Sequence, residues 1–133
     1  MKLKFTPIKE RSAEIIEAVM ASPDIPNDDP LRFRIRLCTE EVVENIVRYA
    51  YPEGVENWME IVTSQEGDLL VLTFTDSGLK FDPLGIPDPD VTLEATERPI
   101  GGLGIFLCKQ MTEEMTYRRD AEFNILTMKI KIK

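Results

Sequence analysis

The sequence predicts an α+β fold, a two-layer sandwich in which helices cover one face of a mixed, mostly antiparallel sheet. Three observations predict it: a long apolar pattern of helical period, two pairs of strand-like segments joined by short turns, and a helix-like segment between those pairs. The chain has 133 residues, enough for one hydrophobic core, so residues 1–133 are expected to form a single domain.

The first half of the chain alternates between short connectors and regular elements. Residues 2–6 alternate charged and apolar side chains, which predicts a short strand. Residues 8–21 carry an apolar stripe of helical period, bounded by Pro7 and Pro23. Residues 31–51 form the longest such stripe, and we expect a helix there that Pro52 and Gly54 end.

The second half supplies most of the sheet. Two strand-like runs flank a turn at Gly67, and a long proline-rich loop then leads to a further helix and a closing strand pair. The predicted segments are strands at 58–64 and 69–75, a loop at 76–101, a helix at 103–111, and strands at 113–119 and 123–131. Loops of that length inside compact domains are uncommon and usually functional.

Composition excludes several classes of function. A net charge of −8 argues against nucleic-acid binding, which needs a basic face. The chain contains no histidine, which excludes Ser-His-Asp and Cys-His catalysis. Cys38 and Cys108 both lie in apolar helical patterns, which is typical of buried thiols. No apolar run is long enough to span a membrane and no signal sequence is visible, so we expect a cytoplasmic protein.

A cluster of glycines opens the last helix, at Gly101, Gly102 and Gly104. Glycine lets a ligand approach the backbone, and the first amides of a helix attract anions. The cluster is therefore a candidate phosphate cradle, although taken alone it is better explained by a tight turn that closes the long loop.

The long helix carries Glu41, Asn45 and Arg48 along one face. The alternative is a solvated stripe, since Glu40 and Glu44 beside them are surface charges. Asn45 is the unusual member, because asparagine is a poor residue inside a helix. Its amide oxygen suits a hard cation such as Mg²⁺.

Asp76 and Gly78 follow the second strand of the predicted hairpin. The carboxylate of Asp76 is suited to accept a hydrogen bond from an exocyclic amine, and Gly78 leaves room for a planar ring. An Asx turn at the end of a strand explains the same residues.

The order of these motifs resembles the GHKL superfamily of Bergerat-fold ATP-binding domains, and within it the anti-sigma-factor serine/threonine kinases of bacteria. Residues 39–47 correspond to the N box, residues 76–78 to the first glycine box and residues 101–105 to the second. The resemblance spans nearly the whole chain and implies a histidine-kinase-like ATPase domain with an ATP lid at about residues 79–101.

The resemblance implies a role for each matching residue. Glu41 would be the general base that takes a proton from an attacking serine hydroxyl, and Asn45 would hold the Mg²⁺ that accompanies ATP. The other residues implied to contact ATP are Arg48, Asp76, Gly78, Arg98, Gly102, Leu103, Gly104 and Thr127. Asp76 would bind the adenine amine, while Thr127 would lie near adenine.

The implied function is that of an ATP-dependent protein-serine kinase, which phosphorylates an anti-sigma-factor antagonist and binds a sigma factor or similar partner. A homodimer is also implied, and Leu3, Phe5, Ile15 and Val19 are candidates for its interface or for the core. Tyr49 stands where the family commonly has histidine. Two alternatives remain at this point: an ATP-dependent binding module without catalysis, and a structural protein.

Overall fold

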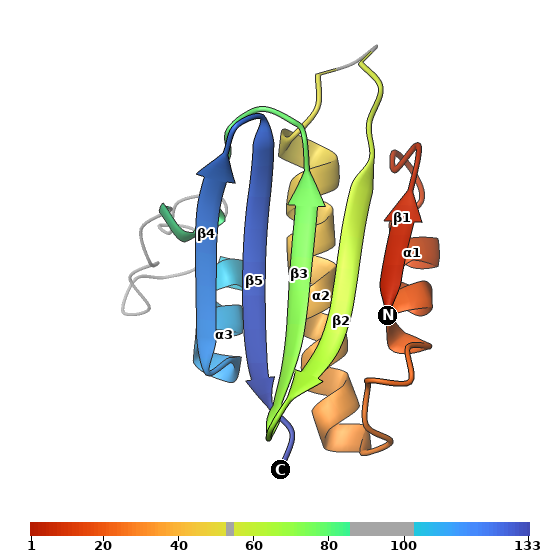
Figure 1. Cartoon of the computed structure of the whole chain (residues 1–133), viewed down its shortest axis with the longest axis vertical. Helices are drawn as coiled ribbons and strands as arrows, with labels where there is room; N and C mark the ends of the chain where they lie inside the picture. Colours follow the sequence, from red (N-terminus) through yellow and green to blue (C-terminus); the bar gives the residue numbers. More distant parts are fainter. Residues whose placement is uncertain (53–54, 86–102) are drawn as a thin grey trace.

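The computed structural model, which describes residues 1–52, 55–85 and 103–133, contains one five-stranded sheet. Its strands are β1 (Lys2–Phe5), β2 (Met59–Glu66), β3 (Leu69–Asp76), β4 (Glu114–Asp120) and β5 (Phe123–Lys131). They lie in the order β1-β2-β3-β5-β4, and each of the four pairings between these strands is antiparallel (Figure 1).

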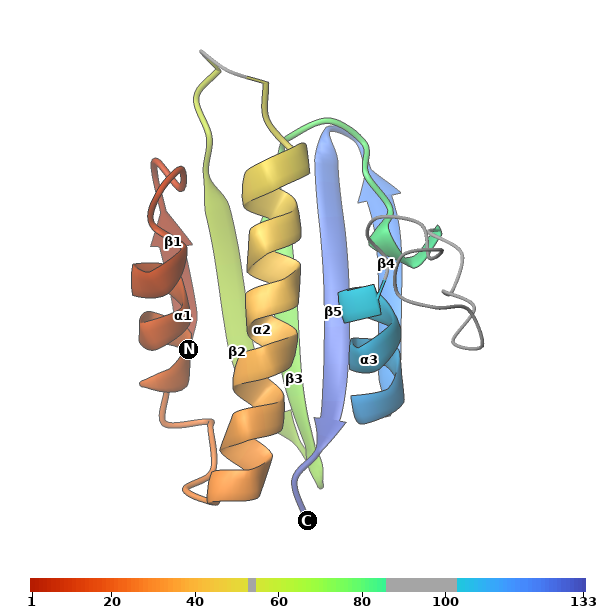
Figure 2. The same cartoon turned by 180° about the vertical axis from the view of Figure 1, so that it is seen from behind.

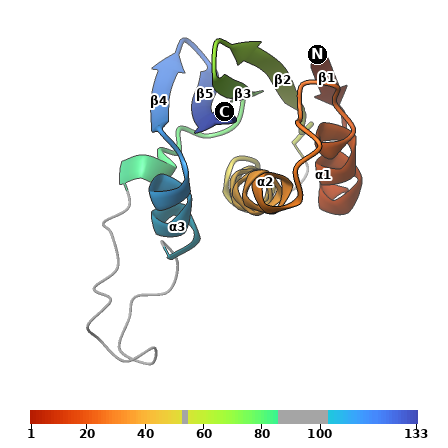
Figure 3. The same ribbon diagram turned by 90° about the horizontal axis from the view of Figure 1, so that it is seen from below.

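In the described ranges, three helices cover one face of this sheet (Figures 2 and 3). They are α1 (Ser12–Met20), α2 (Asp29–Tyr49) and α3 (Leu103–Met111), and a short 3₁₀ turn, η1 (Pro83–Gly85), follows β3. The opposite face of the sheet carries no helix in the part of the chain that the structure describes. The predicted two-layer α+β sandwich is therefore confirmed.

The core lies between the helices and the sheet because the strands alternate buried and exposed side chains. In β3, Leu70, Leu72 and Phe74 face the helices and are at most 1% exposed. From α1, Ile15 and Val19 are completely buried against them, while Leu3 and Phe5 pack on the same core from β1. Of the four residues considered for the core or a dimer interface, Ile15 and Val19 therefore belong to the core, and Leu3 and Phe5 are partly buried against it.

Helix α2 is fixed at both ends by side chains. Asp28 caps its beginning, where the Asp28 carboxylate accepts a hydrogen bond of 3.0 Å from the amide of Leu31. At its other end, the Lys9 ammonium donates to the carbonyl oxygen of Val47 at 2.6 Å. These contacts hold the helix that carries Glu41 and Asn45 in a fixed position over the sheet.

Helix α1 begins at Ser12, later than its apolar stripe predicts. Glu10 has a φ of 63°, which a right-handed helix cannot contain. The amides of Ile8 and Lys9 bind instead to the side-chain oxygen of Asn57, at 2.6 and 3.3 Å. Ile8 still contributes to the core, which is why the pattern extends beyond the helix.

The two edges of the sheet differ from its centre. β1 has only four residues, and its Lys2 and Lys4 are exposed. β4 forms the other edge and exposes Glu114, Arg118 and Asp120. Both edges therefore carry charged side chains, whereas β3 and β5 lie in the interior of the sheet.

Two further predictions concern cysteines and membranes. Cys38 and Cys108 are free and completely buried, as expected. Within the described ranges, no helix is long and apolar enough to cross a bilayer.

Candidate functional site

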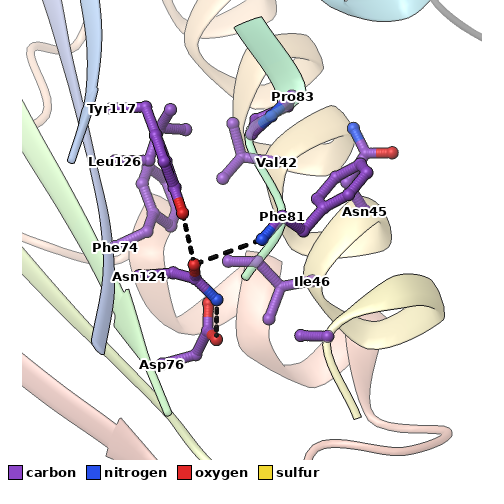
Figure 4. Close-up of a pocket in the computed structure, with 11 residues that line it drawn as sticks. Val42, Asn45, Ile46, Phe74, Asp76, Phe81, Pro83, Tyr117, Asn124 and Leu126 are labelled. Carbon is purple, nitrogen blue, oxygen red and sulfur yellow. Dashed lines mark hydrogen bonds between the residues drawn. The ribbon is translucent and has the colours of Figure 1, made fainter. Parts of the chain in front are cut away.

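A small cavity lies between α2 and the inner face of the sheet, at the end of β3 (Figure 4). It brings together Asn45 of the predicted N box and Asp76 of the predicted first glycine box. Its other lining residues are Val42, Ile46, Ala50, Phe74, Phe81, Pro83, Tyr117, Asn124 and Leu126. Its volume is about 20 Å³, which is room for about one water molecule. A purine would enter only after side chains such as Phe81 and Pro83 have moved.

Asp76 ends β3 and is 3% exposed at the floor of this cavity. Its Oδ1 accepts hydrogen bonds of 2.9 Å from the amide of Gly78 and from Nδ2 of Asn124. Burial raises the pKa of Asp76, whereas these two hydrogen bonds and the charge of Arg119 lower it. Asp76 thus forms the expected Asx turn and also lines a cavity, so the two interpretations of this motif are compatible.

Gly78 passes so close to the end of α2 that no side chain fits there. A Cβ on this residue would overlap the backbone carbonyl of Ala50. The same carbonyl oxygen accepts a hydrogen bond of 2.6 Å from the amide of Leu79. Glycine at this position lets the end of β3 and the end of α2 form one wall of the cavity.

Asn45 presents an unsatisfied buried group. Its Nδ2 is shielded from solvent and has no hydrogen-bond partner among the described residues. In Figure 4, Asn45 and Phe81 lie at the α2 side of the cavity, and Asp76 and Asn124 at the sheet side. An amide that is buried without a partner indicates that a polar ligand completes this site.

Glu41 lies one helical turn before Asn45 and meets the first turn of α3. A Cβ on Gly104 would overlap the Glu41 carboxylate, so the glycine makes room for this side chain. Burial raises the pKa of Glu41, while Arg48 lowers it and Glu44 and Glu40 raise it further. A carboxylate with a raised pKa, at the positive end of a helix, suits an acid–base role.

Arg48 and Tyr49 extend this side of the site. The Arg48 guanidinium lies 5.9 Å from the centre of the Tyr49 ring, and this ring lies 5.2 Å from that of Phe81. Tyr49, the residue that departs from the family pattern, therefore packs against a residue that closes the cavity. Arg48 is also close enough to influence Glu41 electrostatically.

Thr127 does not join the other predicted residues. It pairs with Thr73 on the helix-free face of the sheet, whereas its neighbour Leu126 pairs with Phe74 on the inner face and lines the cavity. Successive residues of a strand point to opposite faces, so Thr127 points away from Asp76. This geometry corrects the expectation that Thr127 lies near adenine.

Asn124 occupies the inner face three residues earlier, and sequence reasoning missed it. A signal was present, because Asn124 shares the parity of the alternating series Leu126, Met128 and Ile130. A polar residue in an inward-facing series indicates a buried polar contact.

The remaining predicted residues belong to the lid and to the start of α3. Arg98 and Gly102, together with most of the predicted lid, lie outside the described residues. Leu103 begins α3 directly before Gly104.

Fold and site together define an ATPase domain of the histidine kinase type. The sequence profile of the histidine kinase-like ATPase domain family matches residues 9–130, so the chain belongs to this family. The resemblance predicted from the three motifs is confirmed. Domains of this family bind ATP, generally with Mg²⁺.

The similar proteins include a serine/threonine-protein kinase, which is a sequence relative, and histidine kinases, which are solved structures. The chain is 28% identical over 98 residues to the serine/threonine-protein kinase BtrW of Bordetella bronchiseptica, covering 74% of this chain and 69% of BtrW. The histidine kinase domain of a blue-light-activated kinase from Erythrobacter litoralis superposes with a TM-score of 0.53 at 21% identity. The match covers 90% of this chain and 57% of that domain.

A second solved structure has the same fold. The Acinetobacter baumannii histidine kinase AdeS superposes with a TM-score of 0.52 at 17% identity, over all of this chain and 68% of AdeS. At these identities the two histidine kinases share the fold with this chain, and the comparison extends no further.

The residues of the site fit a magnesium-bound nucleotide. Nδ2 of Asn45 is buried without a partner among the described residues, and rotation about the last side-chain bond presents either oxygen or nitrogen to a ligand. At Gly104 the backbone of α3 is open to a close approach, which the Glu41 carboxylate makes in this conformation. Asp76 contributes an acceptor at the other end of the cavity.

Proposed function

We propose that this protein is an ATP-dependent protein-serine/threonine kinase of the anti-sigma-factor type. Its substrate would be an anti-sigma-factor antagonist, and its regulatory partner a sigma factor or a similar protein. Support comes from the family, from the kinase name of BtrW, and from the geometry of Glu41. Such a regulator would act in the cytoplasm, where transcription occurs.

The position of Glu41 carries this proposal. Its carboxylate lies against Gly104 at the start of α3, one turn from Asn45 on α2, and burial raises its pKa. A serine hydroxyl that entered this corner would find a base for its proton beside the first amides of a helix, which favour negative charge.

The chain's own residues would divide the work of phosphoryl transfer. Bound Mg-ATP supplies the phosphoryl group and the metal that neutralises its charge. Asn45 would hold the metal, and the backbone around Gly102, Leu103 and Gly104 would bind phosphate. Asp76 would bind the adenine amine, with Gly78 packing near the ring. Glu41 would accept the proton of the serine hydroxyl.

Arginines would add positive charge around the phosphates. Arg48, which already acts electrostatically on Glu41, would help to offset the phosphate charge, and Arg98 would approach from the lid. Both assignments are part of the proposal.

Phosphate transfer to the antagonist tests the kinase assignment. With labelled ATP and a cognate antagonist, we expect Glu41→Gln to lower the transfer rate by at least about 100-fold, because removal of a general base typically costs about 10²–10⁴-fold. The nucleotide dissociation constant should change less than about threefold, because the proposal gives Glu41 no role in binding ATP.

Glu44→Gln is the matched control, since Glu44 is exposed on the same helix and loses the same charge. It should leave the transfer rate within about twofold of that of the wild type. Transfer that survives Glu41→Gln would refute the assigned base. Tight ATP binding without any transfer by the wild-type protein would favour the non-catalytic binding module.

A further inference from the structure

Asn124 is the second residue of β5, and both the oxygen and the nitrogen of its side-chain amide form hydrogen bonds. It is 5% exposed. Its Nδ2 donates to Oδ1 of Asp76 at 2.9 Å and to the carbonyl oxygen of Leu79 at 2.8 Å. Its Oδ1 accepts from the Tyr117 hydroxyl at 2.6 Å, from the Arg119 guanidinium at 3.2 Å and from the amide of Phe81 at 3.3 Å.

These contacts fix which way the amide faces. An amide turned by about 180° would place its oxygen against two acceptors, the Asp76 carboxylate and the Leu79 carbonyl, and its nitrogen against the donors of Arg119 and Phe81. The observed orientation satisfies both donors of the amide nitrogen. Asn124 therefore holds Oδ1 of Asp76 in place, and the hydrogen bonds to Asp76 described above leave its Oδ2 for another donor.

Asn124 also fastens the chain directly after β3. It binds Leu79 and Phe81, and Arg119 beside it donates to the carbonyl oxygen of Gly78 at 2.8 Å. Phe81 is one of the side chains that close the cavity. One side chain thus positions both the carboxylate at the floor of the cavity and the backbone of a residue that covers it.

The charge of the residue at position 124 affects the ionisation of Asp76, because Asp76 is buried. Asn124 is a neutral donor, and its hydrogen bond favours the ionised form of Asp76 against the cost of burial. Among the described residues, Arg119, Tyr117 and Tyr51 interact electrostatically with Asp76, and Asp82 acts on Tyr117. Burial raises the pKa of both tyrosines above their ordinary value of about 10, so the tyrosines stay neutral from about pH 5.5 to 8.5.

We propose that Asn124 is a positioning residue for nucleobase selection, which orients the Asp76 carboxylate to accept a hydrogen bond from an exocyclic amine. Adenine carries that amine, whereas guanine carries a carbonyl oxygen at the corresponding position. A fixed acceptor rejects a second acceptor, so Asn124 would favour adenine nucleotides by holding Asp76 in this role. This inference rests on the proposed function, in which Asp76 binds adenine.

The test compares dissociation constants of Mg-ADP and Mg-GDP, measured by calorimetry from about pH 5.5 to 8.5. For Asn124→Ala we expect the preference for ADP over GDP to fall by at least about tenfold at about pH 7.5, because the acceptor is no longer held. Circular dichroism and the melting temperature check that the variant folds.

Asn124→Asp gives a pH signature that a purely structural role would not give. At low pH the introduced carboxyl group is protonated and donates to Asp76 as the amide did, so ADP should bind nearly as in the wild type. As the pH rises, two buried carboxylates repel each other, and we expect the ADP dissociation constant to increase by about tenfold or more relative to the wild type.

Asn57→Asp is the matched control, because the Asn57 amide also holds backbone amides but lies outside the cavity. Its pH profile should parallel that of the wild type. An unchanged ADP preference in Asn124→Ala, or parallel profiles for Asn124→Asp and the wild type, would overturn the inference while leaving the kinase proposal intact. Failure of the wild-type protein to bind any nucleotide would overturn both.

Discussion

Asp76 shows how one buried residue can favour binding at the expense of stability. In the folded protein, burial raises its pKa above the ordinary carboxyl value of about 4. The unfolded chain therefore loses the proton at a lower pH than the folded chain. The folded state binds more protons between these two pKa values, so this group lowers stability as the pH rises through that window.

Asp76→Asn removes this penalty and also removes the acceptor for adenine. We expect the melting temperature of the nucleotide-free variant to exceed that of the wild type at about pH 7, and the difference to vanish below about pH 4. Its affinity for Mg-ADP should fall at least about tenfold, because a hydrogen bond to a charged group is lost.

Asp68→Asn serves as the control, since Asp68 is exposed in the turn between β2 and β3 and carries the same charge. A melting temperature of Asp76→Asn below that of the wild type at neutral pH would contradict the role of burial.

At the residue level the sequence predicted Asn45 and Asp76, and the structure places both on one cavity. Asn45 was visible because asparagine is a poor residue inside a helix, and Asp76 because it ends a strand two residues before a glycine. Asn124 was missed and Thr127 misplaced for a different reason. One position along a strand decides which face a side chain occupies, and Asn124 shares the face of Leu126 and Met128, whereas Thr127 does not. Thr127 was assigned from the family resemblance and not from this alternation.

At the level of elements, two glycines let neighbouring segments approach α2 closely, and they differ in what they make room for. Gly104 leaves room for the movable carboxylate of Glu41, whereas Gly78 leaves room for the fixed backbone of Ala50. Substitution at these glycines should therefore separate catalysis from stability.

Gly104→Ala should displace Glu41 with little effect on folding. Alanine favours the helix by about 1 kcal/mol, which offsets the cost of moving a flexible side chain, so stability should change by less than about 1 kcal/mol. Phosphate transfer should fall by about 100-fold, because the base loses its position. Denaturant unfolding and the labelled-ATP assay measure the two effects.

Gly78→Ala should instead destabilise the protein by about 1–3 kcal/mol, because the backbone of Ala50 cannot move aside. Gly85→Ala is the control for both variants, since the nearest atom to its added Cβ would be 3.6 Å away. Full transfer activity in Gly104→Ala would show that the contact between Glu41 and α3 is not required.

The elements themselves were well predicted, since each strand and helix lies within a few residues of its sequence pattern. Periodicity predicted them because buried faces impose it. The predicted start of α1 was wrong because Asn57, far along the chain, binds the amides of Ile8 and Lys9 outside the helix. No local sequence pattern contains this contact.

On the scale of the whole molecule, the cavity described here is too small for adenine, so binding must widen it. A ligand that binds only the folded state raises stability by mass action, by about 2.7 kcal/mol at a concentration about 100 times its dissociation constant. For a chain of this size we expect Mg-ATP at such a concentration to raise the melting temperature by about 10 °C.

Thermal unfolding followed by circular dichroism measures this shift. Chelation of Mg²⁺ with EDTA should remove most of it, because Asn45 is proposed to act through the metal. Mg-GTP at the same concentration should give a shift at most half as large, and equal shifts for the two nucleotides would contradict adenine recognition by Asp76.

The edges of the sheet bear on how two copies of this chain would associate. An exposed strand edge invites another strand to extend the sheet across molecules, and natural proteins prevent this with short strands and charges. Here β1 is short and bears lysines, and β4 bears charges of both signs. A continuous sheet that runs through two protomers is therefore disfavoured, and the helix-free face of the sheet is a surface on which two protomers could stack instead (Figure 3).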